Sequence, residues 1–250
     1  MITADVPNER GFETLKLLTD ELRWSLAQQL RWSDRQVGEL VQALHQPQNL
    51  VSYHLSVLRQ AGLVHMRRSE ADARVVYYGL DLSAMRELYA AFGTSFGLAA
   101  AVEQPTTISA PVLFLCTENS ARSQMAEGWL RALSGGRVPA RSAGTVPKTL
   151  HPLATQVMAE AGIDIGYQQA KRVSMFADVQ PAAVITVCDR AREERSAQVS
   201  APITYHWSVP DPARAAATDQ LQAFRDVRDQ LRARVEGLLH DGLAPAQPAR

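Results

Sequence analysis

The chain has 250 residues, of which 46% are hydrophobic and 21% are charged, and its formal net charge is zero. This is the composition of an ordinary globular protein, and the length suits one large domain or two small ones. A neutral chain has no overall field that would steer it to nucleic acid or to an anionic membrane. The first residues contain no apolar signal segment, and the longest apolar run, near residues 96–102, is too short to cross a bilayer. We therefore expect a cytoplasmic protein without a membrane partner.

The sequence contains two cysteines, Cys116 and Cys188. Two thiols cannot build a disulfide framework or a four-thiolate zinc site. They are therefore either buried bystanders or groups that take part in chemistry.

The sequence changes in character near residue 105. Helical periodicity prevails before it, whereas short apolar runs such as VLFL and VITV alternate with helical segments after it. Such alternation is typical of an α/β domain with a parallel sheet. We expect an α+β winged helix-turn-helix domain for DNA binding and dimerisation at 1–100, a linker at 101–110, an α/β domain at 111–242 and a disordered tail at 243–250.

In chain order, the first half of the sequence predicts four helices. The first covers residues 12–30, the second follows the capping-box sequence SDRQ (33–36), and the other two cover residues 48–60 and 82–96. Between the last two, the segment LVHMRRSEADARVVYYGL has two apolar runs around a charged tip, which predicts a β-hairpin. Helix, turn, helix and hairpin form a winged helix-turn-helix. The final helix is apolar enough to pack against a partner.

A DNA-reading helix should carry outward polar side chains, since Gln and Asn pair with adenine edges and Arg binds phosphates. The candidates are Gln48, Asn49, Ser52, Tyr53 and Arg59 on the second helix of the motif, and Arg67, Arg68 and Arg74 on the wing. Residues 1–105 hold 10 Lys and Arg against 12 Asp and Glu, so a dimer is needed to add phosphate contacts. The alternative is a winged helix used only for protein contact.

The sequence QNLVSYHLSVLRQAGLVHMRR, followed by RVVYYGL, resembles the winged-helix repressors typified by the repressor of the arsenical-resistance operon. The resemblance covers about residues 12–95 and implies a homodimer that releases operator DNA when an inducer binds. Related sensors capture arsenite with cysteines near this motif, but this half has none. Three histidines, His45, His54 and His65, could in principle bind zinc; scattered histidines without paired carboxylates are more often surface groups, and no metal site is predicted.

Cys116 ends an expected strand at 112–115 and starts a loop that leads into a helix near Ser123. In such a loop the main-chain amides converge on one point in front of the helix dipole, and this field favours a nucleophilic thiolate. Arg122 adds a planar fork for two oxygens of a tetrahedral dianion. The expected oxyanion-binding residues are Thr117, Glu118, Asn119, Ser120, Ala121, Arg122 and Ser123, with Ser123 donating to the sulfur and Asn119 holding the loop.

An acid is needed to protonate the departing oxygen, and the sequence HWSVPDPARA offers Asp211 in a loop bracketed by prolines. Asp-Pro alone is often only turn chemistry. Together with the cysteine loop, it becomes the candidate general acid.

Residues 112–239 resemble the low-molecular-weight tyrosine phosphatase superfamily. Four segments, CTENSARSQMAEG, SAGT, HPLATQVMAEAGIDI and HW…DPA, resemble its thioredoxin-coupled arsenate reductase branch. This resemblance implies that Cys116 attacks arsenate, that Arg122 and the loop bind it, and that Asp211 protonates the leaving oxygen. Some members bind a structural potassium, and Glu127 and Ser142 match two of its ligand positions; no tightly bound cofactor is expected otherwise. Many relatives have glycine at position 118, where this chain has Glu118.

Cys188 lies at the end of VITVC, where the reductases keep the cysteine that resolves the arsenic adduct. The plain alternative is a packed strand residue. The reductases have a third cysteine seven positions later, and here that position is Arg195. The reductant is therefore either thioredoxin, acting on a Cys116–Cys188 disulfide, or a small thiol such as glutathione or mycothiol that attacks the adduct.

The leading hypothesis is a dimeric regulator of arsenic resistance fused to an arsenate reductase, in which turnover at Cys116 changes DNA affinity. One alternative is a phosphatase, although phosphotyrosine enzymes tend to have an aromatic residue where Ala213 follows Asp-Pro. The other is a sensor of oxyanion, arsenite or redox state without turnover.

Overall fold

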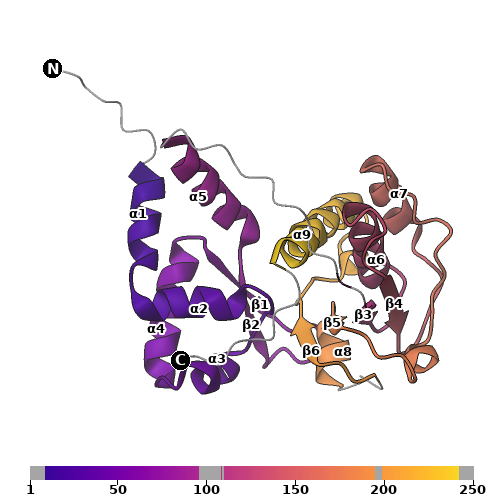
Figure 1. Ribbon diagram of the computed structural model, residues 1–250, viewed down its shortest axis with the longest axis horizontal. Helices are drawn as coiled ribbons and strands as arrows, with labels where there is room; N and C mark the ends of the chain where they lie inside the picture. Colours follow the sequence, from indigo (N-terminus) through magenta and orange to yellow (C-terminus); the bar gives the residue numbers. More distant parts are fainter. Residues whose placement is uncertain (1–8, 96–107, 109, 195–198, 242–250) are drawn as a thin grey trace. The chain divides into compact units, whose positions relative to one another are not determined.

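The computed structural model describes residues 9–95, 108, 110–194 and 199–241. The chain forms two compact units (Figure 1). The first contains residues up to 67 and 76–103, and the second contains 104–247 together with the hairpin tip Arg68–Val75. The predicted linker lies outside the described residues except for residues 108 and 110, as does the predicted tail.

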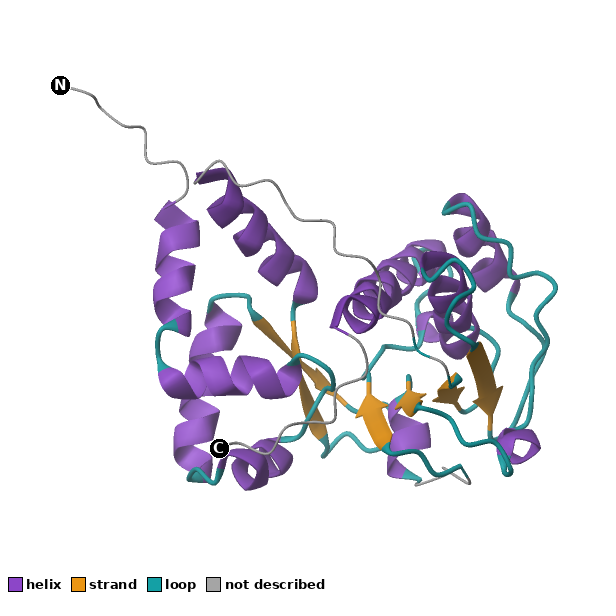
Figure 2. Cartoon of the chain, in the orientation of Figure 1, coloured by secondary structure: helices purple, strands orange, loops and turns teal. Residues whose placement is uncertain are grey.

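The first unit is a winged helix-turn-helix. Its elements are α1 (Glu9–Leu18), α2 (Glu21–Leu30), α3 (Val37–Leu44), α4 (Gln48–Gln60), β1 (Val64–Arg68), β2 (Val76–Leu80) and α5 (Leu82–Ser95). The strands β1 and β2 pair in a two-stranded sheet (Figure 2). Fully buried leucines from α2, α3 and α4 fill the core, among them Leu26, Leu30, Leu40, Leu55 and Leu58.

Two details of the first half differ from the prediction. Residues 12–30 form two helices instead of one, because Asp20 has an extended backbone and its carboxylate accepts a hydrogen bond of 2.9 Å from the amide of Arg23. This N-cap starts a new helix. The helix expected from residue 33 begins at Val37, with the amide of Gln36 donating to Glu39 at 2.8 Å, so the capping box lies three residues later.

The second unit is an α/β domain around a parallel sheet. Its strands are β3 (Val112–Cys116), β4 (Ala140–Gly144), β5 (Ala183–Thr186) and β6 (Ile203–His206), and its helices are α6 (Arg122–Leu133), α7 (Pro152–Glu160), α8 (Asp189–Glu193) and α9 (Gln220–Asp241), with short 3-10 turns at Val173–Phe176 and Pro212–Arg214. The strand order is β4-β3-β5-β6, and all three pairings are parallel. Every residue of β3 and β5 is buried, as expected for strands covered on both faces.

The topology fixes where a site can form. The chain leaves β3 for β4 on one side and later returns to β5 on the other, so loops after β3 and β5 meet at the carboxyl edge of the sheet. Open parallel sheets bind ligands at such a switch point. Helices α6, α7 and α9 pack together on one face, and α8 lies on the other (Figure 1). Among the described helices, none is long and apolar enough to cross a membrane.

Candidate active site

The centre of the site is the loop between β3 and α6. Cys116 is the last residue of β3, and α6 begins six positions later at Arg122. The loop turns tightly because Asn119 has a left-handed backbone, with φ of 48°. The first amide groups of a helix have no partner inside the helix, so α6 directs both donors and the positive end of its dipole toward the loop.

The carbonyl groups of the loop face outward. Those of Thr117, Glu118 and Ser120 accept hydrogen bonds of 2.8–2.9 Å from main-chain amides of residues 146–151. Because a carbonyl and the following amide point in opposite directions in a planar trans peptide, the amides of Glu118, Asn119 and Ala121 face the loop's centre. The amide of Asn119 shows this directly, since it donates to the sulfur of Cys116 at 3.0 Å. The loop therefore has the geometry to bind an anion, which is the role that the sequence predicts for it.

The side chain of Asn119 holds the cradle. Its oxygen accepts from the amide of Lys171 at 2.7 Å, which fixes the orientation of the carboxamide. Its nitrogen then donates to Ser123 and Ser142, each at 2.9 Å. The hydroxyl of Ser123 lies 2.9 Å from the sulfur of Cys116, and it is the donor of this contact when the sulfur is a thiolate. The sulfur thus meets two donors, the arrangement that a thiolate nucleophile needs.

Arg122 joins the loop to the candidate acid. Its guanidinium lies 3.1 Å from the carboxylate of Asp211 and donates to the carbonyl of Val209 at 3.0 Å. The buried environment tends to lower the pKa of Arg122, but the surrounding thiols and carboxylates outweigh it and raise that pKa. Arg122 therefore remains a permanent cation at the site, and the structure brings Asp211 to within contact of it.

Cys188 lies beside the loop. Its sulfur is within 3.5 Å of the hydroxyl of Thr117 and accepts from the amide of Ala191 at 3.4 Å, as the N-cap of α8. Burial, followed by the negative charge of Cys116, raises the pKa of the Cys188 thiol, while Arg122 acts in the opposite sense. Both cysteines are free and buried. Cys188 therefore begins as a protonated thiol next to the nucleophile's loop.

A buried polar cluster behind Cys188 was not predicted. Asp189, fully buried, accepts from the hydroxyl of Ser208 at 2.8 Å and lies 3.3 Å from the ring of His206. That ring contacts the hydroxyl of Thr186 at 2.9 Å. These contacts tie the first residue of α8 to the end of β6. The signal available in the sequence was the presence of polar residues directly after two apolar strand segments.

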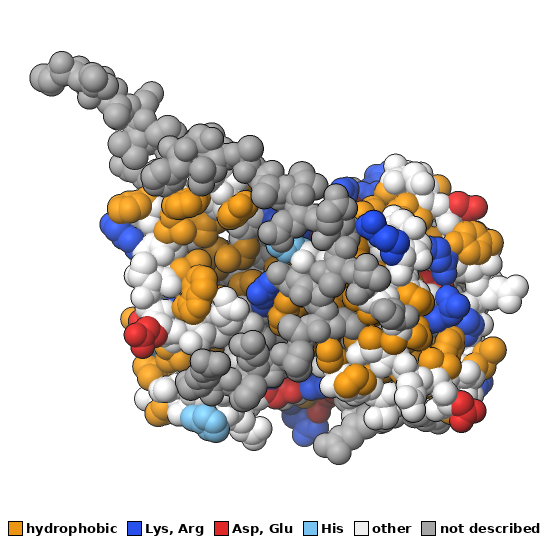
Figure 3. Space-filling view, viewed as in Figure 1, with side chains coloured by type: hydrophobic (Ala, Val, Ile, Leu, Met, Phe, Trp, Pro, Cys, Tyr) orange, Lys and Arg blue, Asp and Glu red, His pale blue; other side chains and the backbone are white. Residues whose placement is uncertain are grey.

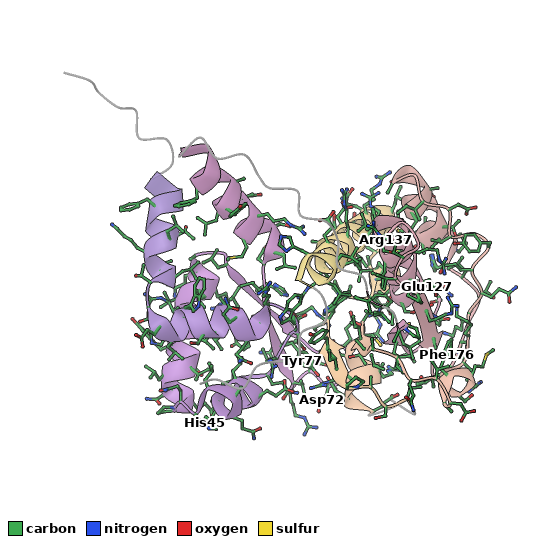
Figure 4. All side chains as sticks on the ribbon, viewed as in Figure 1. His45, Asp72, Tyr77, Glu127, Arg137 and Phe176 are labelled. Carbon is green, nitrogen blue, oxygen red and sulfur yellow. The ribbon has the colours of Figure 1, made fainter. Side chains whose placement is uncertain are left out.

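Glu127 lies on α6, the helix that follows the loop (Figure 4). Its carboxylate accepts a hydrogen bond of 2.5 Å from the hydroxyl of Ser142. The two residues that were predicted as potassium ligands therefore bind each other. The same carboxylate lies 3.4 Å from the ammonium of Lys171 and 2.6 Å from the guanidinium of Arg131. Two cationic side chains therefore already compensate its charge, and the predicted potassium site finds no support in these contacts.

Glu118, the acid that replaces the family glycine, forms an ion pair with Lys148. Both side chains are exposed, so the pair lies at the outer side of the loop. Its charge is thus compensated locally.

The candidate DNA-contacting side chains of α4 are all exposed, and Tyr53 is 61% exposed. On the hairpin, Arg68 and Arg74 are exposed as well, but Arg74 is paired with Asp72 at 2.7 Å. The described residues contain no group of three or more His, Cys, Asp or Glu side chains that could hold a metal. His54 is buried and lies 3.5 Å from Asp20, which accounts for one of the three scattered histidines.

Both halves of the chain are similar to known protein families. Residues 111–244 match the family model described as low molecular weight phosphotyrosine protein phosphatase, and residues 20–66 match that described as bacterial regulatory protein, arsR family. The arsenate reductase of Halalkalibacterium halodurans is 36% identical over 133 residues, which are 52% of this chain and 96% of that protein. The glutaredoxin arsenate reductase of Synechocystis sp. is 35% identical over 128 residues, which are 51% of this chain and 95% of that protein.

A solved structure described as an arsenate reductase in the phosphate binding state is 36% identical, with a TM-score of 0.47, and the match covers 52% of this chain and 96% of that one. The chain belongs to the low molecular weight phosphotyrosine protein phosphatase family, and within it to the group of arsenate reductases. It joins this domain to a helix-turn-helix of the arsR family in one polypeptide.

The register of the sheet makes Gly144 part of the site. Gly144 pairs with Cys116, and a Cβ atom there would lie 2.6 Å from the carbonyl of Thr117 and 2.9 Å from the amide of Asn119. We expect Gly144→Ala to push the loop out of shape, to destabilise the protein by about 1–3 kcal/mol and to weaken phosphate binding at least about tenfold. Denaturant unfolding and calorimetric titration with phosphate measure the two effects.

The matched control is Gly237→Ala, since Gly237 lies in α9 and a Cβ atom there meets nothing within 4 Å. It should leave phosphate binding unchanged and the free energy of unfolding equal or higher by up to about 1 kcal/mol. Equal behaviour of the two variants would contradict the role given to Gly144.

Proposed function

We propose that the second unit reduces arsenate to arsenite and that the first unit is a DNA-binding regulator of transcription. The observation that carries the enzymatic proposal is a second thiol, Cys188, beside a cysteine that already lies in an amide-lined anion cradle. A phosphatase needs only the first thiol and water, whereas reduction needs electrons from two sulfurs.

In the first step, arsenate binds in the cradle with Arg122 compensating its charge, and the thiolate of Cys116 attacks arsenic. A sulfur–arsenic bond forms and an oxygen leaves as water after it accepts a proton from Asp211. The contact of 3.1 Å between Arg122 and Asp211 supports this assignment, because both groups then face the same oxyanion. Arg122, with its fixed charge, stabilises the dianion throughout.

In the second step, the thiolate of Cys188 attacks the sulfur of Cys116. A disulfide forms, the electron pair of the sulfur–arsenic bond passes to arsenic, and arsenite leaves. Two thiolates are oxidised and one As(V) is reduced to As(III), so the electrons balance. The pKa of Cys188 is raised by burial, so this step requires loss of its proton on opening of the segment.

An external thiol resets the enzyme. A dithiol of the thioredoxin type reduces the Cys116–Cys188 disulfide, or a monothiol such as glutathione or mycothiol attacks the arsenic adduct in place of Cys188. The resemblance to a relative named as a glutaredoxin arsenate reductase supports a thiol reductant of one of these kinds.

The decisive experiment compares arsenite production by the wild type, Cys116→Ser and Cys188→Ser with thioredoxin and with small thiols. We expect Cys116→Ser to lose activity with every reductant, and Cys188→Ser to lose it with thioredoxin. We expect Asp211→Asn to lower kcat by about 10²–10⁴-fold because the leaving oxygen lacks its proton donor. Asp229→Asn, an exposed acid on α9, is the control.

Full activity of Cys188→Ser with a small thiol would overturn the intramolecular disulfide step. Cleavage of a phosphate ester without arsenite production by the wild type would replace the reductase with a phosphatase. Oxyanion binding without either reaction would indicate a sensor.

The raised pKa of Cys188 also predicts a pH dependence. Below that pKa only a small fraction of the thiol is ionised, and this fraction grows about tenfold per pH unit. The rate of disulfide formation in a single turnover should therefore increase from pH ~6 to pH ~9 without reaching a plateau at the ordinary thiol pKa of ~8.5. Rapid quenching with a thiol-alkylating reagent, followed by mass measurement, gives the rate; a rate that falls or stays constant over this range would be inconsistent with Cys188 as a buried thiol.

For the regulator, the exposed polar face of α4 supports operator binding. Exposed hydrophobic side chains on the first unit, Phe12, Trp24, Tyr89 and Phe92, support a dimer through α1, α2 and α5 (Figure 3). Ligand binding or turnover at Cys116 can alter DNA affinity only if it favours one state of the dimer over the other.

We expect Gln48→Ala and Asn49→Ala each to weaken binding to a duplex selected from a random library by about 1–3 kcal/mol, because each removes contacts to base edges. Gln60→Ala, at the far end of the same helix and hydrogen-bonded to Ser56, is the control. Fluorescence anisotropy gives the affinity, with and without arsenate or arsenite, and sedimentation gives the dimer. Unchanged affinity in both α4 variants would leave the winged helix as a protein-contact module.

A further inference from the structure

The second unit holds a carboxylate that comes from the hairpin tip, residues 68–75, and that contacts the oxyanion site. One oxygen of Glu70 lies 3.2 Å from the guanidinium of Arg122, and the other accepts a hydrogen bond of 2.6 Å from the amide of Asp211. The side chain of Glu70 is 21% exposed. Glu70 thus binds both the fixed cation of the site and the main chain of the candidate acid.

The tip presents Glu70 in a defined conformation. The buried hydroxyl of Ser69 accepts from the amides of Ala71 and Asp72, at 3.0 and 3.2 Å, and so closes a turn around Glu70. The amide of Glu70 donates to the buried carboxylate of Asp189 at 3.0 Å. The main chain of Glu70 is therefore anchored next to Cys188, and its side chain is anchored at Arg122.

One oxygen of Glu70 occupies a nitrogen of the Arg122 guanidinium, 3.2 Å away, and a guanidinium that binds a tetrahedral dianion uses these same nitrogens. Arg122 is the group that we assign to arsenate, so Glu70 and the oxyanion require the same cation. Holding both would leave two negative groups against one guanidinium, and like charges at this separation disfavour each other. Binding of either one therefore weakens binding of the other.

We infer that Glu70 is a positioning residue of the oxyanion site: its carboxylate holds Arg122 and the main chain at Asp211 while no oxyanion is bound, and it leaves when an oxyanion enters. Oxyanion binding then releases the tip 68–75. This inference rests on the assignment of Arg122 to oxyanion binding in the proposed function, and it adds a competitor from the hairpin to that site.

The test uses the full chain with inorganic phosphate as the probe. In a Cys116→Ser background, Glu70→Gln should bind phosphate about three- to tenfold more tightly than the background alone, because the competing charge is gone and the shape is kept. Glu160→Gln is the matched control: it removes another acid of the second unit, on α7, that is paired with Arg225 at 2.8 Å. It should change the affinity by less than about twofold.

A second readout follows the tip itself. Saturating phosphate should increase amide hydrogen exchange at residues 68–75 in the Glu160→Gln control, whereas in Glu70→Gln exchange there should already be high without phosphate. In otherwise unmodified protein, Glu70→Gln should lower KM for arsenate and leave kcat within about twofold, since a group that leaves before chemistry affects binding only.

Equal phosphate affinity in Glu70→Gln and its background, or exchange at the tip that phosphate does not alter, would overturn the inference. Phosphate binding and exchange do not depend on turnover. If phosphate affinity and exchange at the tip both change as expected while no arsenite is formed, the reductase proposal fails and the role of Glu70 stands. If arsenite is formed but neither measurement changes, the role of Glu70 fails and the reductase proposal stands.

Discussion

The site depends on a main chain that turns tightly enough between β3 and α6 for its amides to converge on the sulfur of Cys116. This geometry cannot be made by the loop alone. The carbonyls must be held outward by residues 146–151, and Gly144 must leave room for the loop to pass. Asn119 then links the loop to the serines on either side. The shape of this loop thus depends on the sheet register as much as on the loop sequence.

The features that could be predicted from the sequence are those formed by residues close together in the chain. The strand, the loop and the start of α6 are contiguous, so the spacing of Cys116 and Arg122 was sufficient to predict the cradle. The winged helix was also predictable, apart from the break at Asp20, where a short capping signal outweighs apolar periodicity. Asp211 was proposed from an Asp-Pro loop after a strand-like run, and Cys188 from the resemblance to arsenate reductases; the structure places Asp211 3.1 Å from Arg122 and Cys188 beside Thr117.

Gly144, the Asp189 cluster and Glu70 were not predicted, since each acts through a neighbour far away in sequence. A glycine in a strand reveals nothing of the loop that crosses it until the register Cys116–Gly144 is known. Asp189 reads as an ordinary helix-start acid, yet it is fully buried. Glu70 lies in a charged hairpin tip, for which solvent exposure is the usual expectation.

The hairpin tip has a consequence for dissecting the chain. Residues 68–75 are encoded between two strands of the first unit but pack with the second. A fragment that begins after the linker would therefore lack Ser69 and Glu70, and with them the contact of Glu70 with Arg122 and the hydrogen bond from its amide to Asp189. Kinetic constants measured on such a fragment would describe a different enzyme from the one in the intact polypeptide.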